Sequence, residues 1–290
     1  MREDTPAAAP TCTLREEGGF ESLCIHREHF LNIDSTQTYL TEKRLPELQR
    51  ALSGSLHRPT IYIASADHQD VGRGKGSRSW FSSKEHINFA MSLLFEIPAR
   101  MVAKAPLFTQ LLALIATKSL ESSLPGSMAQ IKWPNDLIIR GRKVGGILAE
   151  LHLMGSDSYS IIIGIGINLD IPDEVLNEGV SGTGRWPPGA IKQILGVEID
   201  ASKLRHDISS YFIREIVSFI TNNGVSGALV DEISRRQIFV GSNIHFSEGG
   251  PEPIIGIHRG VDASTGGIVI ELPGGNTRVF HSGEIIYRLD

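Results

Sequence analysis

Three cations alternate with glycines in GRGKGSRSW at residues 72–80, a segment that contains no acidic residue. Glycine lets backbone N–H groups come close to a ligand, and the cations Arg73, Lys75 and Arg78 suit an anion. The segment ends at Trp80, whose indole offers a flat face for stacking. Alone, such a segment is usually a solvated turn. It indicates an anion site only if other parts of the chain supply matching groups.

Two further segments supply such groups. KWPNDL at residues 132–137 contributes a lysine and an adjacent Asn-Asp pair, and RKVGGIL at residues 142–148 contributes a second lysine before two glycines. Cations placed beside glycine turns are typical of sites that hold phosphates. Together with the first segment, they indicate nucleotide chemistry.

The common nucleotide-binding fingerprints do not fit these segments. In GRGKGS a glycine follows the lysine where a Walker A loop needs Ser or Thr, and Gln69 stands in place of the first glycine. In GIGIN at residues 164–168, Leu169 follows where a dinucleotide fingerprint needs its last glycine. The nucleotide chemistry must therefore use another arrangement.

Composition sets mild limits on the function. The chain has 290 residues, 41% of them hydrophobic, which fits one large domain or a main domain with a small appendage. A formal net charge of -5 disfavours non-specific nucleic-acid binding. The two cysteines form no disulfide framework, and the sequence contains no apolar run long enough to span a membrane. We expect a cytoplasmic protein without nucleic-acid or membrane partners.

The hydrophobic pattern predicts buried strands with helices between them along the chain. Strand-like runs occur at 60–66, 87–97 and 158–170, and residues 106–120 have helical spacing. Residues 171–190 are rich in Gly and Pro, which indicates a long loop.

Short β-type runs separated by Gly, Pro, Asn and Asp begin at Ile238. This spacing predicts a small antiparallel barrel appended to the main domain. The expected divisions are a flexible leader at 1–20, a ligand-binding domain at 21–236 and the barrel at 237–290.

The motifs together resemble the biotin protein ligases, from about Asp34 to the C-terminus. The resemblance is carried by DSTQ at 34–37, GRGKGSRSW after Gln69, Asn88 with Ser92, KWPNDL, RKVGGILAE and IGIGINLD. It implies an α+β fold: a mixed, mainly antiparallel seven-stranded sheet flanked by helices, of the class II synthetase-like kind, followed by an SH3-type β-barrel. The family's regulatory branch carries an N-terminal DNA-binding domain. Barely thirty residues precede the first motif, so we expect the form without that domain.

The resemblance implies an activity and a set of site residues. A ligase of this family activates biotin with ATP and Mg²⁺ as biotinyl-5′-AMP, then transfers it to a lysine of a biotin carboxyl carrier domain. The implied biotin-binding residues are Ser35, Thr36, Gln37, Gln69, Gly72, Arg73, Gly74, Lys75, Ser92, Lys143, Gly145 and Gly146. The implied ATP-binding residues are Arg73, Lys75, Arg78, Trp80, Lys132, Asn135 and Asn168. Lys143, Lys132 and Arg78 would act in catalysis, and Asp136 would hold the magnesium ion.

Three residues in or just before the segment at 72–80 depart from the usual pattern. Lys75 stands where an arginine is usual, Ser77 where a glycine is usual, and Asp70 where a neutral residue is common. Lysine keeps the charge but loses the bidentate geometry of arginine, so the segment could close differently over an adenylate.

Two other functions stay open. A lipoate or octanoate ligase or transferase shares the lysine that precedes the glycine turn, and a non-enzymatic biotin-binding regulator could share the pocket. Homodimerisation through an exposed sheet edge is a further possibility.

Overall fold

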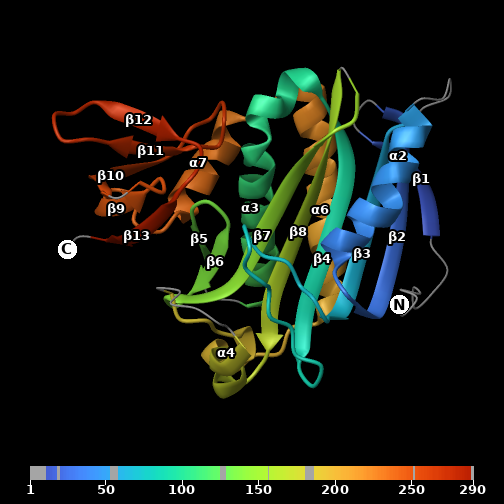
Figure 1. The fold of residues 1–290 in the computed structure, drawn as a ribbon, viewed down its shortest axis with the longest axis horizontal. Helices are drawn as coiled ribbons and strands as arrows, with labels where there is room; N and C mark the ends of the chain where they lie inside the picture. The colour runs from blue at the N-terminus through green and yellow to red at the C-terminus, as the bar shows by residue number, and fades with distance from the viewer. Residues whose placement is uncertain are drawn as a thin grey trace.

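The computed structural model describes residues 11–17, 20–52, 58–124, 129–155, 157–179, 186–250 and 252–288. A large twisted sheet fills its centre, and a smaller sheet lies beside one end of it (Figure 1).

The large sheet has eight strands in the order β1-β2-β3-β4-β8-β7-β6-β5. Its strands are β1 Thr11–Glu17, β2 Phe20–Ile33, β3 Thr60–Gln69, β4 Ile87–Pro98, β5 Ala129–Lys132, β6 Asp136–Ile139, β7 Arg142–Leu153 and β8 Ser158–Asp170. Strands β2 and β3 run parallel, and every other neighbouring pair is antiparallel. The expected mixed, mainly antiparallel sheet is therefore confirmed.

The expected flexible leader is wrong where the structure describes it. Residues 11–17 form β1, which pairs with β2 so that Thr11 lies opposite Arg27. This strand makes the sheet eight-stranded rather than seven-stranded. Polar, charged composition concealed it, because an edge strand needs backbone partners more than apolar side chains. Residues 1–10 lie outside the described part.

Helices cover the two faces of the sheet unequally. The helical segments are α1 Thr36–Tyr39, η1 Leu40–Arg44 (a π-helical turn), α2 Leu45–Leu52, η2 Ala99–Lys104 (3₁₀), α3 Pro106–Ser123, α4 Asp173–Gly179, α5 Ile191–Leu195, α6 Ala201–Asn222 and α7 Gly227–Arg236. On one face α3 and α6 pack along the sheet, with the Phe95 ring 5.1 Å from Phe108 and 6.3 Å from Phe212. On the other face α1, η1 and α2 pack over β2, β3 and β4 and reach β8, through Leu40, Leu48 and Ile162. Farther along this face, Arg73 pairs with Glu150 of β7, and the ring of Trp80 lies against Gly146 and Gly166.

Local signals in the sequence set the ends of α6. Asp200 accepts hydrogen bonds from the backbone N–H groups of Ser202 and Lys203, which caps the first turn. Asn223 ends the helix in the left-handed region at φ 53°.

The expected loop at 171–190 instead contains the short helix α4, whose first turn begins with two acidic residues. Residues 180–185 lie outside the described part.

The smaller sheet has five antiparallel strands in the order β12-β11-β10-β9-β13. They are β9 Asn243–Ser247, β10 Ile254–Val261, β11 Ile268–Glu271, β12 Thr277–Phe280 and β13 Glu284–Arg288. The indole N–H of Trp133 donates to the carbonyl of Gly266 at 3.1 Å, and its ring lies 5.8 Å from that of Phe246. The two sheets therefore share one continuous apolar core. The boundary between residues 236 and 237 stays a prediction.

No helix in the described ranges combines the length and the apolar character that crossing a membrane requires.

A buried histidine predicts how stability depends on pH. Burial lowers the pKa of His258 from 6.5 to about 4, and its Nδ1 contacts the carbonyl of Ile238 at 3.3 Å. Between those two pKa values the unfolded chain binds the proton and the folded chain does not, so stability falls as the pH falls from 6.5 towards 4. At pH 5 the loss should be about 2 kcal/mol.

Urea unfolding of the wild type and of His258→Asn at pH 7 and pH 5 measures this loss. Asparagine can still donate towards Ile238 but does not titrate, so the variant should lose about 2 kcal/mol less than the wild type between the two pH values. Equal losses in both proteins would assign the pH dependence to other groups.

Candidate active site

Neighbouring residues of β4, β8, β7 and β6 form the floor of the candidate site, on the face opposite α3 and α6. Ser92, Gly164 and Leu148 lie side by side in one row across the strands. In the next row, Gly166, Gly146 and Asp136 lie side by side. Side chains two residues apart on a strand share a face, so both rows point to the same side of the sheet.

The N-terminus of α1 forms the roof of a polar end of the site. Ser35 caps the helix with extended backbone, and its hydroxyl accepts from the N–H of Thr38 at 3.4 Å. The backbone N–H of Thr36 donates to Oε1 of Gln69 at 2.8 Å, at the end of β3. The hydroxyls of Thr36 and Ser92 lie 2.8 Å apart. The side chains of Ser35, Thr36, Gln69 and Ser92 are all buried, and the last three, all predicted biotin-binding residues, form one network.

Gln37 extends this network to β7. Its Oε1 accepts from the hydroxyl of Ser92 at 3.2 Å, and its Nε2 donates to Oε2 of Glu150 at 3.1 Å. A Cβ at residue 164 would stand 2.7 Å from both Gln37 Oε1 and Ser92 Oγ. Glycine is therefore required there, because any side chain would push these two groups apart.

The glycine-basic loop, residues 70–80, folds back on itself at this polar end. The N–H of Gly74 donates to the carbonyl of Arg78 at 2.9 Å, and the N–H of Trp80 donates to the carbonyl of Gly72 at 2.8 Å. The guanidinium of Arg73 forms an ion pair with Glu150. The loop is thus held over β7 at the edge of the polar network.

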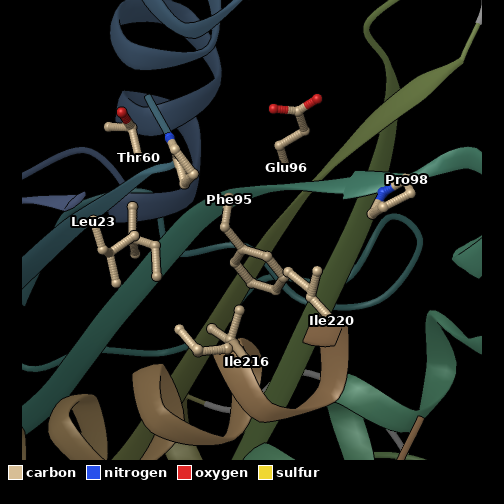
Figure 2. A pocket seen from close by; sticks show the side chains of 10 residues that line it. Leu23, Thr60, Phe95, Glu96, Pro98, Ile216 and Ile220 are labelled. Atoms are coloured by element: carbon tan, nitrogen blue, oxygen red, sulfur yellow. The ribbon is translucent and has the colours of Figure 1, made fainter. Parts of the chain in front are cut away.

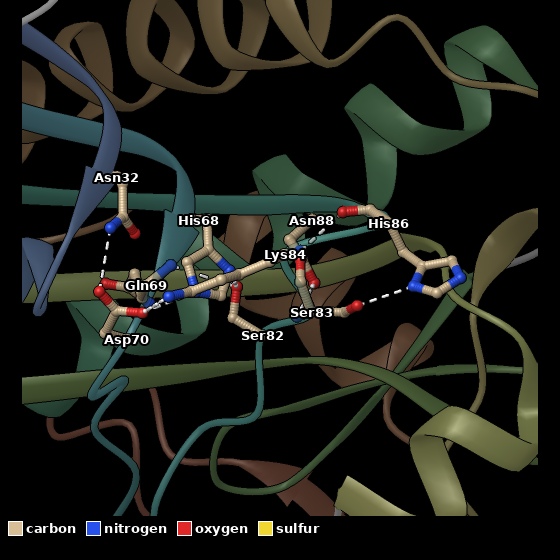
Figure 3. A network of polar contacts seen from close by, with 9 residues as sticks. All are labelled: Asn32, His68, Gln69, Asp70, Ser82, Ser83, Lys84, His86 and Asn88. Carbon is tan, nitrogen blue, oxygen red and sulfur yellow. Dashed lines mark hydrogen bonds and ion pairs between the residues drawn. The ribbon is translucent and has the colours of Figure 1, made fainter.

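A second set of polar contacts fastens the outer side of the loop (Figure 3). Asp70 pairs with Lys84 at 2.7 Å and accepts from the amide of Asn32 at 2.9 Å, and these partners, with Lys84 first, hold the pKa of the Asp70 carboxyl well below its usual range. His68 lies 3.2 Å from both Asp70 and the hydroxyl of Ser82. Asp70, the departure noted in the sequence, therefore joins the two ends of the loop.

Two lysines and two carboxylates form a charged end. Lys132 is only 1% exposed, and its Nζ lies 3.2 Å from Glu284 Oε1 and 3.9 Å from Asp136 Oδ2. Lys143 Nζ lies 2.6 Å from the other oxygen of Asp136. A buried ammonium needs such partners, because an unpaired charge in the interior is strongly unfavourable.

The ring of Trp80 lies on the floor beside these charges. A Cβ at residue 166 would stand 2.5 Å from its indole, and one at residue 146 would stand 3.1 Å from it. Lys143 Nζ lies 5.9 Å from the ring centroid. The two glycines thus make room for a flat side chain against the sheet. Whether Trp80 stacks on adenine stays a prediction.

Glu284 is a site residue that the sequence analysis missed. It comes from β13 in the small sheet, which carries no glycine-cation motif. Partial burial alone would raise the pKa of its carboxyl. The nearby charges of Lys132, Arg78 and Lys143 outweigh this effect, so the pKa lies below its usual value. An acidic residue near the end of a β-rich segment gives no local signal, because its partner Lys132 is remote in sequence.

The side-chain amides of the two predicted asparagines donate hydrogen bonds to backbone carbonyls of the protein. Nδ2 of Asn135 donates to the carbonyl of Ile147 at 2.7 Å, and Nδ2 of Asn168 donates to that of Gly189 at 3.0 Å. These bonds hold the turn before β6 and the segment before α5 against the sheet. Lys75 and Arg78 are exposed on the glycine-basic loop, where Nε of Arg78 donates to the carbonyl of Lys75. Contact of these four residues with a nucleotide remains a prediction.

The described side chains do not form a ready magnesium site. They include no group of three or more His, Cys, Asp or Glu residues that could hold a metal ion. The carboxylate of Asp136 is already engaged by two ammonium groups. Magnesium often binds through one or two carboxylates together with substrate phosphates, so Asp136 alone would be an incomplete site.

An apolar cavity of about 240 Å³ lies on the other face of the sheet, between β2, β3, β4 and α6 (Figure 2). Its lining includes Leu23, Phe95, Ile216 and Ile220, with Glu96 as the one ionisable residue. It lacks the cations that a nucleotide would need and is separate from the site described above.

The site as a whole can hold a ligand with two unlike ends. Gly164, at the polar end, and Asp136, at the charged end, are two residues and two strands apart, which is roughly 12 Å. The polar end offers neutral donors and acceptors, and the charged end offers two lysines. A small molecule with a neutral polar head and a carboxylate tail, joined at that tail to a phosphate, fits this arrangement.

Comparisons with known proteins agree with this geometry. A family model described as the Biotin/lipoate A/B protein ligase family matches residues 32–168. The bifunctional ligase/repressor BirA of Bacillus subtilis is 34% identical over 169 residues, covering 57% of this chain and 48% of the relative. The biotin--[acetyl-CoA-carboxylase] ligase of Mycobacterium tuberculosis is 27% identical over 245 residues, covering 83% of each chain. The chain spans about half the length of the first of these relatives.

The fold also matches a solved structure. The biotin protein ligase of Aquifex aeolicus, in complex with biotin and ATP, superimposes with a TM-score of 0.66 at 23% identity, covering 89% of this chain and 97% of that one. Residues 32–168 thus match the biotin/lipoate A/B protein ligase family, and the fold of the chain is similar to that of the solved biotin protein ligase.

Proposed function

We propose that this protein is an ATP-dependent biotin–protein ligase. The observation that carries the proposal is the pairing of a buried network of neutral hydrogen-bonding groups with two lysines on the same face of the sheet. Biotin has a cyclic urea at one end and a carboxylate at the other, which matches this pairing. The names of the relatives, biotin ligases among them, support the same substrate.

The first step joins biotin to AMP. An oxygen of the biotin carboxylate attacks the α-phosphorus of ATP, the bond between that phosphorus and the bridging oxygen breaks, and pyrophosphate leaves. Because both reactants are anions, the step needs fixed positive charge that is shielded from water. Lys132 supplies a buried charge, and Lys143 supplies one that is 31% exposed.

Asp136 holds Lys143 ready for this step. In the structure Lys143 Nζ is bound to the Asp136 carboxylate at 2.6 Å. We propose that the reacting carboxylate and phosphate take the place of Asp136 as the partner of Lys143. Mg²⁺ would enter with the phosphates of ATP and neutralise part of their charge, with Asp136 as the candidate carboxylate ligand. Arg78, at the loop, would contact phosphate from the other side.

In the second step a lysine amine of a biotin carboxyl carrier domain attacks the acyl carbon of biotinyl-5′-AMP. The bond to the phosphate oxygen breaks, AMP leaves, and the attacking nitrogen loses a proton. We propose the carrier domain of a biotin-dependent carboxylase as the partner and the cytoplasm as the setting. Homodimerisation stays a prediction.

A lipoate or octanoate ligase is the second candidate, because the family model includes lipoate ligases. Those acyl chains lack a urea and would leave the buried hydroxyls and amides of the polar end without partners, which is costly. Pyrophosphate release measured with biotin and with lipoate separates the candidates. The proposal expects release with biotin only; release with lipoate only would reverse the assignment.

Replacing Lys143 should abolish most of the adenylation activity. Lys143→Ala removes a charge held at the reacting groups, and losing one such contact typically slows the chemical step on the order of 10²–10³-fold. Single-turnover pyrophosphate release measures the effect.

Lys118→Ala is the matched control, since Lys118 is half exposed and pairs with Glu232 on the opposite face of the sheet. It should release pyrophosphate at the wild-type rate. Near-normal release by Lys143→Ala would remove this lysine from the mechanism.

The small sheet should contribute to ATP handling through Glu284. Glu284→Gln weakens the partner of the buried Lys132, so that lysine should be less well placed for phosphate. We expect the KM for ATP to rise about tenfold and the affinity for biotin to change less than threefold. Glu271→Gln, which breaks the Arg259–Glu271 ion pair elsewhere in the small sheet, should change neither. An unchanged KM in Glu284→Gln would make the contact incidental.

A further inference from the structure

An unbroken series of hydrogen bonds runs from the glycine-basic loop through the polar end of the site. It begins at Arg73 and passes through Glu150 and Gln37 to Ser92, whose oxygen accepts from the hydroxyl of Thr36. The backbone N–H of Thr36 then donates to Gln69. Gln69 immediately precedes the loop that carries Arg73, so the series and the chain close into a ring. None of the sequence motifs assigns a role to Glu150.

The direction of these bonds follows from Glu150. An ionised carboxylate can only accept, so it must receive Nε2 of Gln37 and the guanidinium of Arg73. The amide of Gln37 cannot be reversed, because its oxygen would then face a negative charge. Its Nε2 is also fixed by the carbonyl of Ile162 at 3.1 Å.

The orientation of Gln37 in turn fixes the proton of Ser92. Oε1 of Gln37 can only accept, so the hydroxyl of Ser92 donates to it at 3.2 Å. The oxygen of Ser92 is then left with lone pairs and no proton to offer. At the other end of the series, the backbone N–H of Thr36 fixes Oε1 of Gln69, and Nε2 of Gln69 is left as a donor.

The groups that remain match a cyclic urea. A urea presents one carbonyl oxygen, which accepts, and two N–H groups, which donate. Nε2 of Gln69 can donate to the carbonyl, and the hydroxyl oxygens of Thr36 and Ser92 can accept from the N–H groups. A site whose buried groups are all oriented in advance rejects a ligand with the opposite pattern strongly, because the buried groups then stay unpaired.

We propose that Glu150 is a positioning residue that determines specificity for the urea head of the substrate, by fixing the hydrogen-bond direction through Gln37 to Ser92. This proposal rests on the proposed function, since it concerns the same pocket. Glu150 touches the network and the loop, and it acts on the ligand only through them.

Glu150→Gln tests the proposal with little change in shape. The variant loses the ion pair to Arg73 and allows the amide of Gln37 to reverse, so Ser92 no longer has a fixed direction. We expect the Kd for biotin, measured by titration calorimetry without ATP, to rise about 10- to 100-fold. The KM for ATP should stay within about threefold, and trypsin should cut faster after Arg73 in the ligand-free variant.

Glu121→Gln is the matched control. Glu121 is 25% exposed, against 27% for Glu150, and also forms a paired ion contact with an arginine, Arg236, away from the site. It should leave biotin affinity unchanged.

A double-variant cycle separates this role from a simple tether. If Glu150 acts through Ser92, the pair Glu150→Gln with Ser92→Ala should bind biotin within about threefold of Ser92→Ala alone. Additive losses would show that Glu150 acts only on the loop and would overturn the proposal. Wild-type affinity in Glu150→Gln would overturn it as well, while a wild type that neither binds biotin nor releases pyrophosphate would overturn the proposed function itself.

Discussion

The burial of Lys132 is the constraint on which the rest of the site depends. Its side chain is only 1% exposed, so its charge must be neutralised by carboxylates at fixed positions. Asp136 supplies one from the adjacent strand, and Glu284 supplies the other from the small sheet. Asp136 also holds Lys143, so the same carboxylate places both lysines. The position of the small sheet is thereby part of the electrostatics of the site, and the Trp133 contacts in the shared core keep it there.

Glycines on β7 and β8 leave the space that the polar network and the ring of Trp80 occupy. Gly164 leaves room for the Gln37–Ser92 bond, while Gly146 and Gly166 leave room for the ring of Trp80. These positions lie in adjacent rows of one sheet face, which sets the polar end beside the charged end. On the opposite face α3 and α6 pack against the sheet, so the floor of the site lies on the apolar core.

Sequence reasoning predicted the parts of the site that carry local signals. The strand and helix runs with strong apolar patterns, such as residues 106–120, lie within elements of the expected kind, and the motif residues Thr36, Gln69 and Ser92 meet in one network. Strand β1 was missed because its residues are polar and its partner is another strand. Glu284 was missed because its role depends on tertiary contact with Lys132. Glu150 lay within a recognised motif, but its charge acquires meaning only when Arg73 and Gln37 are brought to it.

The account depends most on one ligand spanning both ends of the site. A crystal structure with a non-hydrolysable analogue of biotinyl-5′-AMP tests this directly. The urea ring should lie within hydrogen-bond distance of Gln69, Thr36 and Ser92, and Lys143 should leave Asp136 for an oxygen of the phosphate position. A ligand bound elsewhere, or a Lys143 still paired with Asp136 beside the bound analogue, would contradict the account.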